Sequence, residues 1–379
     1  FPIQTLMIAI ASGTGVGINA LLSRNLGEKN YQAADTAAKN GLFLGIASCI
    51  IFAVIGGLGS HYFFAAQTDN QTIVAYGTQY LTIITVCSAG IFLQITLERL
   101  MQSTGKTIYN MITQGTGAII NIILDPILIF GSFGLPRLEV AGAALATIIG
   151  QVIAVLMSFY FNLTRNKEIS ISLKGFRPHM RTIAVIYEVG VPSIIMQAIG
   201  SVMTFGMNKI LLIFSSTAAA VFGVYFKLQS FIFMPVFGLN NGMIPIIAFN
   251  YGARNKERII QTIKLSVAVA VSIMLIGLAI FQTLPGFLLK NLFDASDNML
   301  DIGVPALRII SLSFLFAGYC IIVGSVFQAL GNAVYSLIVS ICRQLLMLLP
   351  SAWILAMTFG LDAVWWSFPI AENVSFAVS

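Results

Sequence analysis

Long apolar segments separated by short polar loops constrain the fold of this 379-residue chain more than any other feature. Hydrophobic residues make up 58% of the sequence and charged residues only 9%, against about 25% charged residues in a soluble domain. No single core could keep this much apolar surface from water, so the folded chain must be solvated by lipid. Each segment is long enough to cross about 30 Å of hydrocarbon as a helix. The segments are residues 2–23, 40–65, 74–98, 108–131, 139–163, 183–214, 217–249, 260–285, 300–330, 334–358 and 362–379. The sequence therefore predicts an all-α membrane protein with about eleven helices.

Positive charge is concentrated in alternate loops. The loops near residues 30, 102, 170 and 255 hold Arg24, Lys29 and Lys39; Arg99 and Lys106; Arg165, Lys167, Lys174, Arg177 and Arg181; and Arg254, Lys256 and Arg258. The opposite loops carry acids, Asp69 and Asp294 among them. Because cytoplasmic loops are enriched in Lys and Arg, we expect the four basic loops to face the cytoplasm and the chain to cross the plasma membrane several times. The net charge of +6 is then explained by the Lys and Arg residues of the cytoplasmic loops, and no nucleic-acid partner is expected.

The two halves of the chain repeat each other. At an offset of 225, five residues recur: Gly13, Gly17, Asn25, Gly27 and Asn30 in the first half, and Gly238, Gly242, Asn250, Gly252 and Asn255 in the second. At an offset of 226, four more recur: Gln102, Gly105, Tyr109 and Gly134 in the first half, and Gln328, Gly331, Tyr335 and Gly360 in the second. Internal repeats of this length are typical of transporters. We expect two pseudo-symmetric helical bundles, residues 1–163 and 183–379, joined by the cytoplasmic loop 164–182. Residues 183–214 have no partner in the first half. This indicates a six-plus-six plan without its first helix and with its last helix truncated.

A carboxylate within an apolar segment marks the strongest candidate site. Asp125 lies in segment 108–131, where a charge costs about 2.5–3.5 kcal/mol on insertion scales. Asn121, four residues earlier, shares its helix face, and Pro126 should displace the carbonyl of Ile122. Such an oxygen cluster suits a proton or a small cation such as Na⁺. The alternative is a structural role, in which the helix is kinked and neighbouring side chains form hydrogen bonds with the Asp125 carboxylate. The matching stretch of the second half, residues 348–351, contains no acid, which favours a functional role.

Other intramembrane polar residues extend this hypothesis. We expect Gln114 and Thr147 to add oxygens to a cation-coupling site with Asp125 and Asn121. In the second half, Lys227, Glu372 and Gln197 are the candidates for lining a substrate cavity. Glu98 and Arg343 lie near segment ends, so we expect them at the membrane surface.

The sequence does not indicate an enzyme. The chain has two histidines, His61 and His179, and no metal-ligand, nucleophile-elbow or phosphate-loop pattern. No cofactor is expected apart from a coupling ion.

Several stretches together resemble the multidrug and toxic compound extrusion (MATE) family. They are residues 23–31 (SRNLGEKNY), 102–105 (QSTG), 121–126 (NIILDP), 142–147 (GAALAT), 250–254 (NYGAR) and 328–331 (QALG). The resemblance implies two six-helix lobes around a central cavity, and export of cationic or apolar compounds driven by inward Na⁺ or H⁺. In similar prokaryotic members the Asn and Asp of the fifth helix help to form a cation site, and these match Asn121 and Asp125. Another subgroup of the family has a pair of acidic residues on its seventh and tenth helices. This chain has Gly200 and Tyr319 near those positions, so it does not match that subgroup.

The predicted function is therefore cation-coupled antiport of drugs or toxic organic cations by alternating access, carried out by a monomer in contact with membrane lipid. One alternative is a flippase for lipid-linked precursors, which would need several cavity cations where this chain offers Lys227, Lys209 and Arg308. Another is an ion channel, which would not need two asymmetric lobes with one buried acid.

Overall fold

The computed structural model describes residues 2–68, 70–131 and 136–379; Asp69 and the repeat position Gly134 lie outside them. The described residues form helices and loops without a strand, which confirms the predicted all-α class. The chain divides into two compact units, Phe1–Val191 and Pro192–Ser379. The division falls within α7 (Met180–Leu212), so this helix contributes its first turns to one unit and its remainder to the other.

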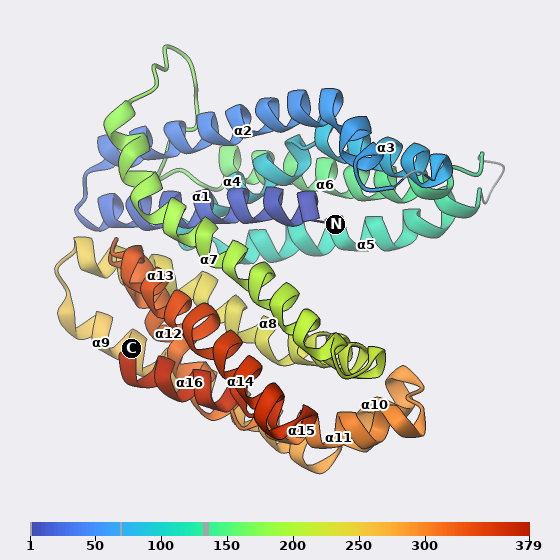
Figure 1. Ribbon diagram of the computed structural model, residues 1–379. Helices are drawn as coiled ribbons and strands as arrows, with labels where there is room; N and C mark the ends of the chain where they lie inside the picture. Colours follow the sequence, from blue (N-terminus) through green and yellow to red (C-terminus); the bar gives the residue numbers. More distant parts are fainter. Residues whose placement is uncertain (1, 69, 132–135) are drawn as a thin grey trace. The chain divides into compact units, whose positions relative to one another are not determined.

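The first unit is built from six helices and the start of α7 (Figure 1). They are α1 (Pro2–Gly27), α2 (Tyr31–Ala65), α3 (Gln71–Val86), α4 (Ala89–Ser103), α5 (Thr107–Phe130) and α6 (Glu139–Thr164). Its largest core cluster joins Ile18 and Leu22 of α1, Ala38 of α2, Leu97 of α4 and Ile186 of α7, all fully or almost fully buried. α5 and α6 run side by side and pack along much of their length.

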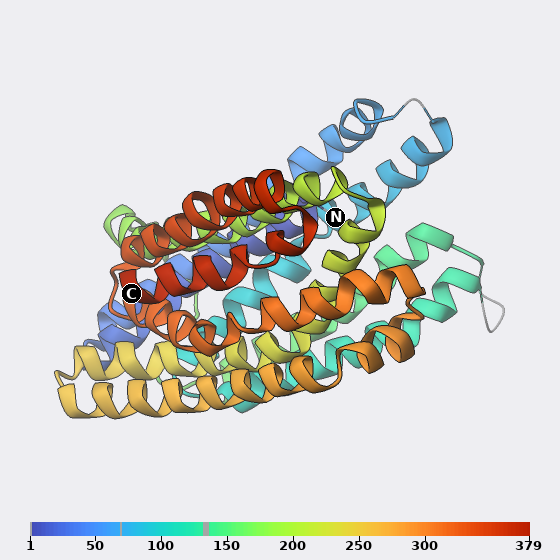
Figure 2. The ribbon, with the colours of Figure 1, turned by 60° about the horizontal axis from the view of Figure 1, so that its bottom comes forward.

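The second unit follows the same plan with more interruptions (Figure 2). Its elements are α8 (Ser216–Gly252), α9 (Lys256–Thr283), α10 (Pro285–Phe293), α11 (Asp297–Ser311), α12 (Phe314–Ala329), α13 (Ala333–Ile341), the π-helix η2 (Cys342–Leu348), α14 (Leu349–Phe359), α15 (Leu361–Val364) and α16 (Ser367–Val378). Aromatic residues fill its core: Phe222, Tyr225, Phe281, Phe314 and Trp365 are each at most 2% exposed. α9 packs along both α8 and α12.

All eleven apolar segments are helical, but their lengths differ from the expectation. Nine helices in the described part of the chain are long and apolar enough to cross a membrane, and ten if α11 and α12, bent by 51° at their break, count as one span. The remaining segment forms α15 and α16, the longer of which has 12 residues. These elements make the chain a membrane protein with several spans.

The junctions between helices repeat in atomic detail at the offsets seen in the sequence. Lys29 and Arg254 both adopt left-handed backbone angles, with φ of 58° and 55°. The backbone N–H groups of Asn30 and Asn255, which follow them, donate to the carbonyls of Asn25 and Asn250 at 2.9 Å in both cases. Similarly, Gly105 and Gly331 have φ of 78° and 88°. Matching sequence motifs therefore encode matching turns in the two units.

Candidate functional site

Close backbone contact between α5 and α6 positions the candidate site in the first unit. A Cβ added to Gly150 would lie 2.6 Å from the carbonyl oxygen of Gly117, and one added to Gly142 would lie 2.5 Å from that of Leu128. Small residues allow membrane helices to approach in this way. Because the contacts flank Asp125 along α5, the polar side chains between them are held at short range across the two helices.

The predicted group around Asp125 lies on these facing surfaces. The Asn121 amide nitrogen is 3.4 Å from Asp125 Oδ1 and 3.4 Å from Thr147 Oγ1. The Thr147 hydroxyl in turn donates to the carbonyl of Ala143 at 3.0 Å. Both Asn121 contacts are long for hydrogen bonds, and all three side chains are half-buried. α5 continues through Pro126 as one helix. The Asp125 carboxylate is thus oriented by weak contacts with its neighbours.

Next to this group is a pocket of about 240 Å³ with a polar lining. Its side chains come from α4, α5 and α6, and include Gln94, Gln114, Asn121, Thr147 and Gln151. Three of the four predicted coupling residues therefore line one pocket, and Asp125 contacts it through Asn121. Gln114, however, is turned towards a different acid.

That acid is Glu98, whose side chain is enclosed by protein. Glu98 is only 3% exposed. Its carboxylate accepts from Gln114 Nε2 at 2.6 Å, from Gln94 Nε2 at 3.0 Å and from the Thr113 hydroxyl at 3.4 Å. A buried charge needs such partners, because transfer from water is otherwise very costly. The four-residue spacing of Gln94 and Glu98, which puts both on one helix face, was the signal available in the sequence.

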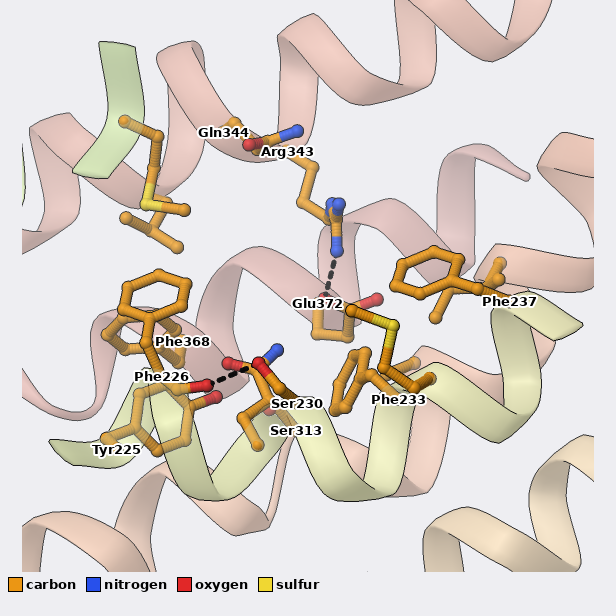
Figure 3. A pocket seen from close by; sticks show the side chains of 16 residues that line it. Tyr225, Phe226, Ser230, Phe233, Phe237, Ser313, Arg343, Gln344, Phe368 and Glu372 are labelled. Atoms are coloured by element: carbon orange, nitrogen blue, oxygen red, sulfur yellow. Dashed lines mark hydrogen bonds and ion pairs between the residues drawn. The ribbon is translucent and has the colours of Figure 1, made fainter. Parts of the chain in front are cut away.

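The second unit holds a larger pocket of about 330 Å³. Figure 3 shows Arg343 reaching towards Glu372, and Arg343 Nη1 lies 3.1 Å from Glu372 Oε2. The expected extension of Arg343 to the membrane surface is therefore wrong: the guanidinium pairs with an acid 6% exposed. The π-helix η2 carries Arg343 and its neighbour Gln344, and both line the pocket.

The other predicted cavity residues of the second unit lie elsewhere. Glu372 lines the 330 Å³ pocket, but Lys227 does not. The Lys227 side chain is exposed, and its ammonium lies 5.9 Å from the centre of the Phe293 ring. Gln197 is an exposed residue of α7. Within the described ranges, no three His, Cys, Asp or Glu side chains are grouped as metal ligands.

These features define a class: a multi-span α-helical membrane protein made of two repeated units, each with a polar pocket that contains or adjoins an acid. The chain belongs to the MatE family, whose sequence model matches residues 1–127 and 192–354. This confirms the predicted family resemblance. It also makes the chain a membrane transporter and not an enzyme.

Similar proteins cover nearly the whole chain. It is 29% identical to the multidrug export protein MepA of Staphylococcus haemolyticus (strain JCSC1435), over 98% of this chain and 81% of the relative. It is 27% identical, with the same coverage, to MepA of Staphylococcus aureus (strain MSSA476). Among solved structures, an outward-facing multidrug resistance MATE family transporter of the MOP superfamily matches with a TM-score of 0.93 and 24% identity, over 100% of this chain and 84% of the other.

A MOP superfamily transporter from Pyrococcus furiosus matches with a TM-score of 0.91 and 23% identity, over 100% and 85% of the two chains. Both structural matches show that the fold is shared.

Proposed function

We propose that this protein is a cation-coupled antiporter of the plasma membrane that exports cationic or apolar drugs by alternating access. Inward movement of Na⁺ or H⁺ would supply the driving force. Support for drug export comes from the relatives that are named multidrug export proteins. The observation that carries the coupling is the Asp125 group: a carboxylate in a membrane helix, oriented by Asn121 and Thr147 beside a polar pocket.

The coupling follows from the cost of a charge in the membrane. An ionised Asp125 is expensive while it is shielded from water, so binding a proton or Na⁺ lowers the free energy of states in which the site is closed. The empty, charged carboxylate favours states in which water reaches it. An ion that binds one conformation better than the other shifts the equilibrium between them. Asn121 and Thr147 would supply neutral oxygens to a bound Na⁺, or hydrogen-bond partners to a protonated acid.

The alternative of a lipid-linked precursor flippase has less support. An anionic headgroup would require unpaired cations around a cavity. Lys227 does not line the pocket of either unit described above, and Lys209 lies 5.7 Å from the centre of the Phe205 ring. Arg343 is neutralised by Glu372. Among the described residues, the pocket beside the Asp125 group and the pocket with Arg343 and Glu372 therefore offer no surplus of positive charge to a phosphate.

The proposal is tested by transport in vesicles that contain the purified protein. Efflux of ethidium would be followed under a Na⁺ gradient alone and under a pH gradient alone. We expect one of the gradients to drive efflux, and Asp125→Asn to abolish it while leaving expression and thermal unfolding near normal. The control is Asp301→Asn, which alters an exposed acid and should transport normally. Full efflux by a well-folded Asp125→Asn protein would contradict the coupling role of Asp125.

A further inference from the structure

A groove at one end of α6 takes no part in the proposed transport mechanism. It encloses about 660 Å³ between α2, α6 and the segment that leads from α6 to α7, which is within the size range of small-molecule sites. All of its lining residues belong to the first unit. Figure 1 shows the connecting segment as a green trace beside α2. An occupant of the groove would therefore contact two membrane helices and this segment together.

The wall contributed by the connecting segment is built from residues that alternate between apolar and polar, a pattern typical of an extended chain. Ile169 and Ile171 are each 7% exposed and join the core of the first unit. Ser170 and Ser172 are exposed and line the groove. The backbone N–H of Ser170 donates to the carboxylate of Asp35 at 2.7 Å, and Asp35 itself does not line the groove. The wall is thus fastened to the unit and presents two hydroxyl groups.

Polarity changes along α6 in the order in which a phospholipid changes from its chains to its headgroup. Phe159 and Leu163 are four residues apart, so they share one helix face, and they are 44% and 59% exposed. Because α6 is long and apolar enough to cross a membrane, lipid chains contact this face. One turn further on, Asn166 and Lys167 line the groove just beyond the end of the helix. Apolar atoms therefore lie on the membrane side of the groove, and polar atoms lie past the helix end.

The groove can accept a negative charge. Lys167 forms no ion pair among the described residues, whereas the adjacent Glu168 is paired with Lys106. Residues 164–182 carry five Lys or Arg residues and one acid. The Ser172 oxygen accepts from a backbone N–H at 3.4 Å, so its hydroxyl proton remains available to a phosphate.

A buried acceptor beside these donors lacks a partner. Asn166 is 2% exposed. Its amide nitrogen donates to Asn162 Oδ1 at 3.0 Å and to the carbonyl of Leu100 at 3.4 Å. Its own Oδ1 has no hydrogen-bond donor within the part of the chain that the structure describes. Since a buried acceptor without a donor is unfavourable, the occupant of the groove is expected to carry hydrogen-bond donors as well as negative charge.

We propose that this groove binds one anionic phospholipid whose headgroup carries hydroxyl groups, as that of phosphatidylglycerol does. The phosphate contacts Lys167 and the two serine hydroxyls. A headgroup hydroxyl donates to Asn166 Oδ1, and an acyl chain lies along Phe159 and Leu163. The lipid is a resident ligand and not the exported compound, so this proposal does not depend on the coupling role of Asp125. When it is bound, the lipid holds the connecting segment against α2 and α6.

The test is native mass spectrometry of the purified full chain, freed of lipid in detergent and then titrated with dioleoyl lipids. Phosphatidylglycerol carries both the charge and the hydroxyls, phosphatidylethanol has the same charge without a free hydroxyl, and phosphatidylcholine has no net charge. We expect phosphatidylglycerol to bind at the first site about tenfold more tightly than phosphatidylcholine and several-fold more tightly than phosphatidylethanol. Millimolar sn-glycerol 3-phosphate should not compete, because it lacks acyl chains.

Variants isolate the groove from general charge attraction. Lys167→Gln should weaken phosphatidylglycerol binding about fivefold, the effect of one Lys beside an anionic lipid surface, and leave the unfolding temperature without lipid unchanged. Lys256→Gln, at an exposed position in a basic loop of the second unit, is the matched control and should bind normally. The double variant Ser170→Ala/Ser172→Ala changes no charge and should weaken binding several-fold.

Three results would overturn the assignment. One is an equal loss of binding in the two Lys variants, because it would show only general attraction between charges. Another is competition by sn-glycerol 3-phosphate, because it would show that the groove takes a soluble phosphate. The third is an affinity for phosphatidylglycerol equal to that for either of the other lipids.

Discussion

The Gln114 side chain of α5 donates to Glu98 of α4 at 2.6 Å, and this bond ties a buried acid to the polar pocket of the first unit. Glu98 also accepts from Gln94 and Thr113, so its burial depends on amide and hydroxyl donors and not on a counter-charge alone. A second acid therefore adjoins the pocket near Asp125 through two of the glutamines that line it. The contribution of these hydrogen bonds to stability can be measured.

Replacing Gln114 should destabilise the protein more than replacing Glu98 conservatively. Gln114→Leu leaves a buried carboxylate oxygen short of a donor, which should lower the free energy of unfolding by about 1–3 kcal/mol. Glu98→Gln removes the charge and retains hydrogen-bonding capacity, so its loss should be smaller. Thermal unfolding in detergent measures both. Gln151→Leu, in the same pocket, is the matched control, and a loss as large as that of Gln114→Leu would argue against the Glu98 bond.

The contact between α5 and α6 should tolerate no added side chain at Gly150. Gly150→Val places carbon atoms against the backbone of Gly117, where a Cβ alone would be 2.6 Å from the carbonyl oxygen. Overpacking of this kind costs about 1–3 kcal/mol and should also separate Thr147 from Asn121. Gly115→Ala, where a Cβ meets open space, is the control. A drop in unfolding temperature for Gly150→Val alone is the expected result.

A loop ion pair should make stability depend on pH. Burial raises the pKa of Glu168, but the hydrogen bond and charge of Lys106, together with hydrogen bonds from the backbone N–H groups of Glu168 and Lys167, outweigh it, so the pKa in the folded protein lies below its ordinary value. A depressed pKa contributes stability above the unfolded value, about 4.3, and this contribution disappears as pH falls through the folded pKa.

The unfolding temperatures of the native protein and Lys106→Gln should therefore differ near neutral pH and converge at about pH 3. Lys167→Gln serves as the control. A difference that persists in acid would show that Lys106 acts through packing and not through its charge.

Left-handed residues at the repeated junctions should accept glycine. Lys29 and Arg254 have φ of 58° and 55°, a conformation that costs a residue with a Cβ roughly 1–2 kcal/mol. Lys29→Gly and Arg254→Gly should each be more stable than the corresponding Ala variant by about 1 kcal/mol. Comparing Gly with Ala removes the effect of the lost charge. Equal unfolding temperatures within each pair would indicate that the turns relax.

The positions of the helices were predictable from the sequence, because apolar length alone decides what can span lipid. The turns were predictable in part: matched Asn and Gly residues at a constant offset indicated equivalent junctions. The break between α3 and α4 at Cys87 and Ser88 carries no Pro or Gly and gave no such signal. The π-helix η2 likewise depends on how its surroundings pack, which local propensity does not express.

The candidate sites were predictable where one helix supplies the residues. The pairing of Asn121 with Asp125 follows from helical spacing, but the partners and burial of Glu98 and Arg343 do not. Both were placed by their distance from the segment end, whereas helix face and partner decide burial. Arg343 pairs with Glu372, an acid on another helix, and Glu98 depends on Gln114 of α5. Sequence periodicity within one segment does not reveal such pairings.

The backbone contacts of Gly150 with Gly117, and of Gly142 with Leu128, have a mechanical consequence. They join α5 to α6 on both sides of Asp125, so the two helices have little freedom to slide or part near the acid. Any motion that opens or closes access to Asp125 must therefore move α5 and α6 together as a rigid pair. Bending would be confined to the ends of the pair or to the neighbouring helices. An ion would then enter and leave along the pocket face of this pair, and not through a gap between its two helices.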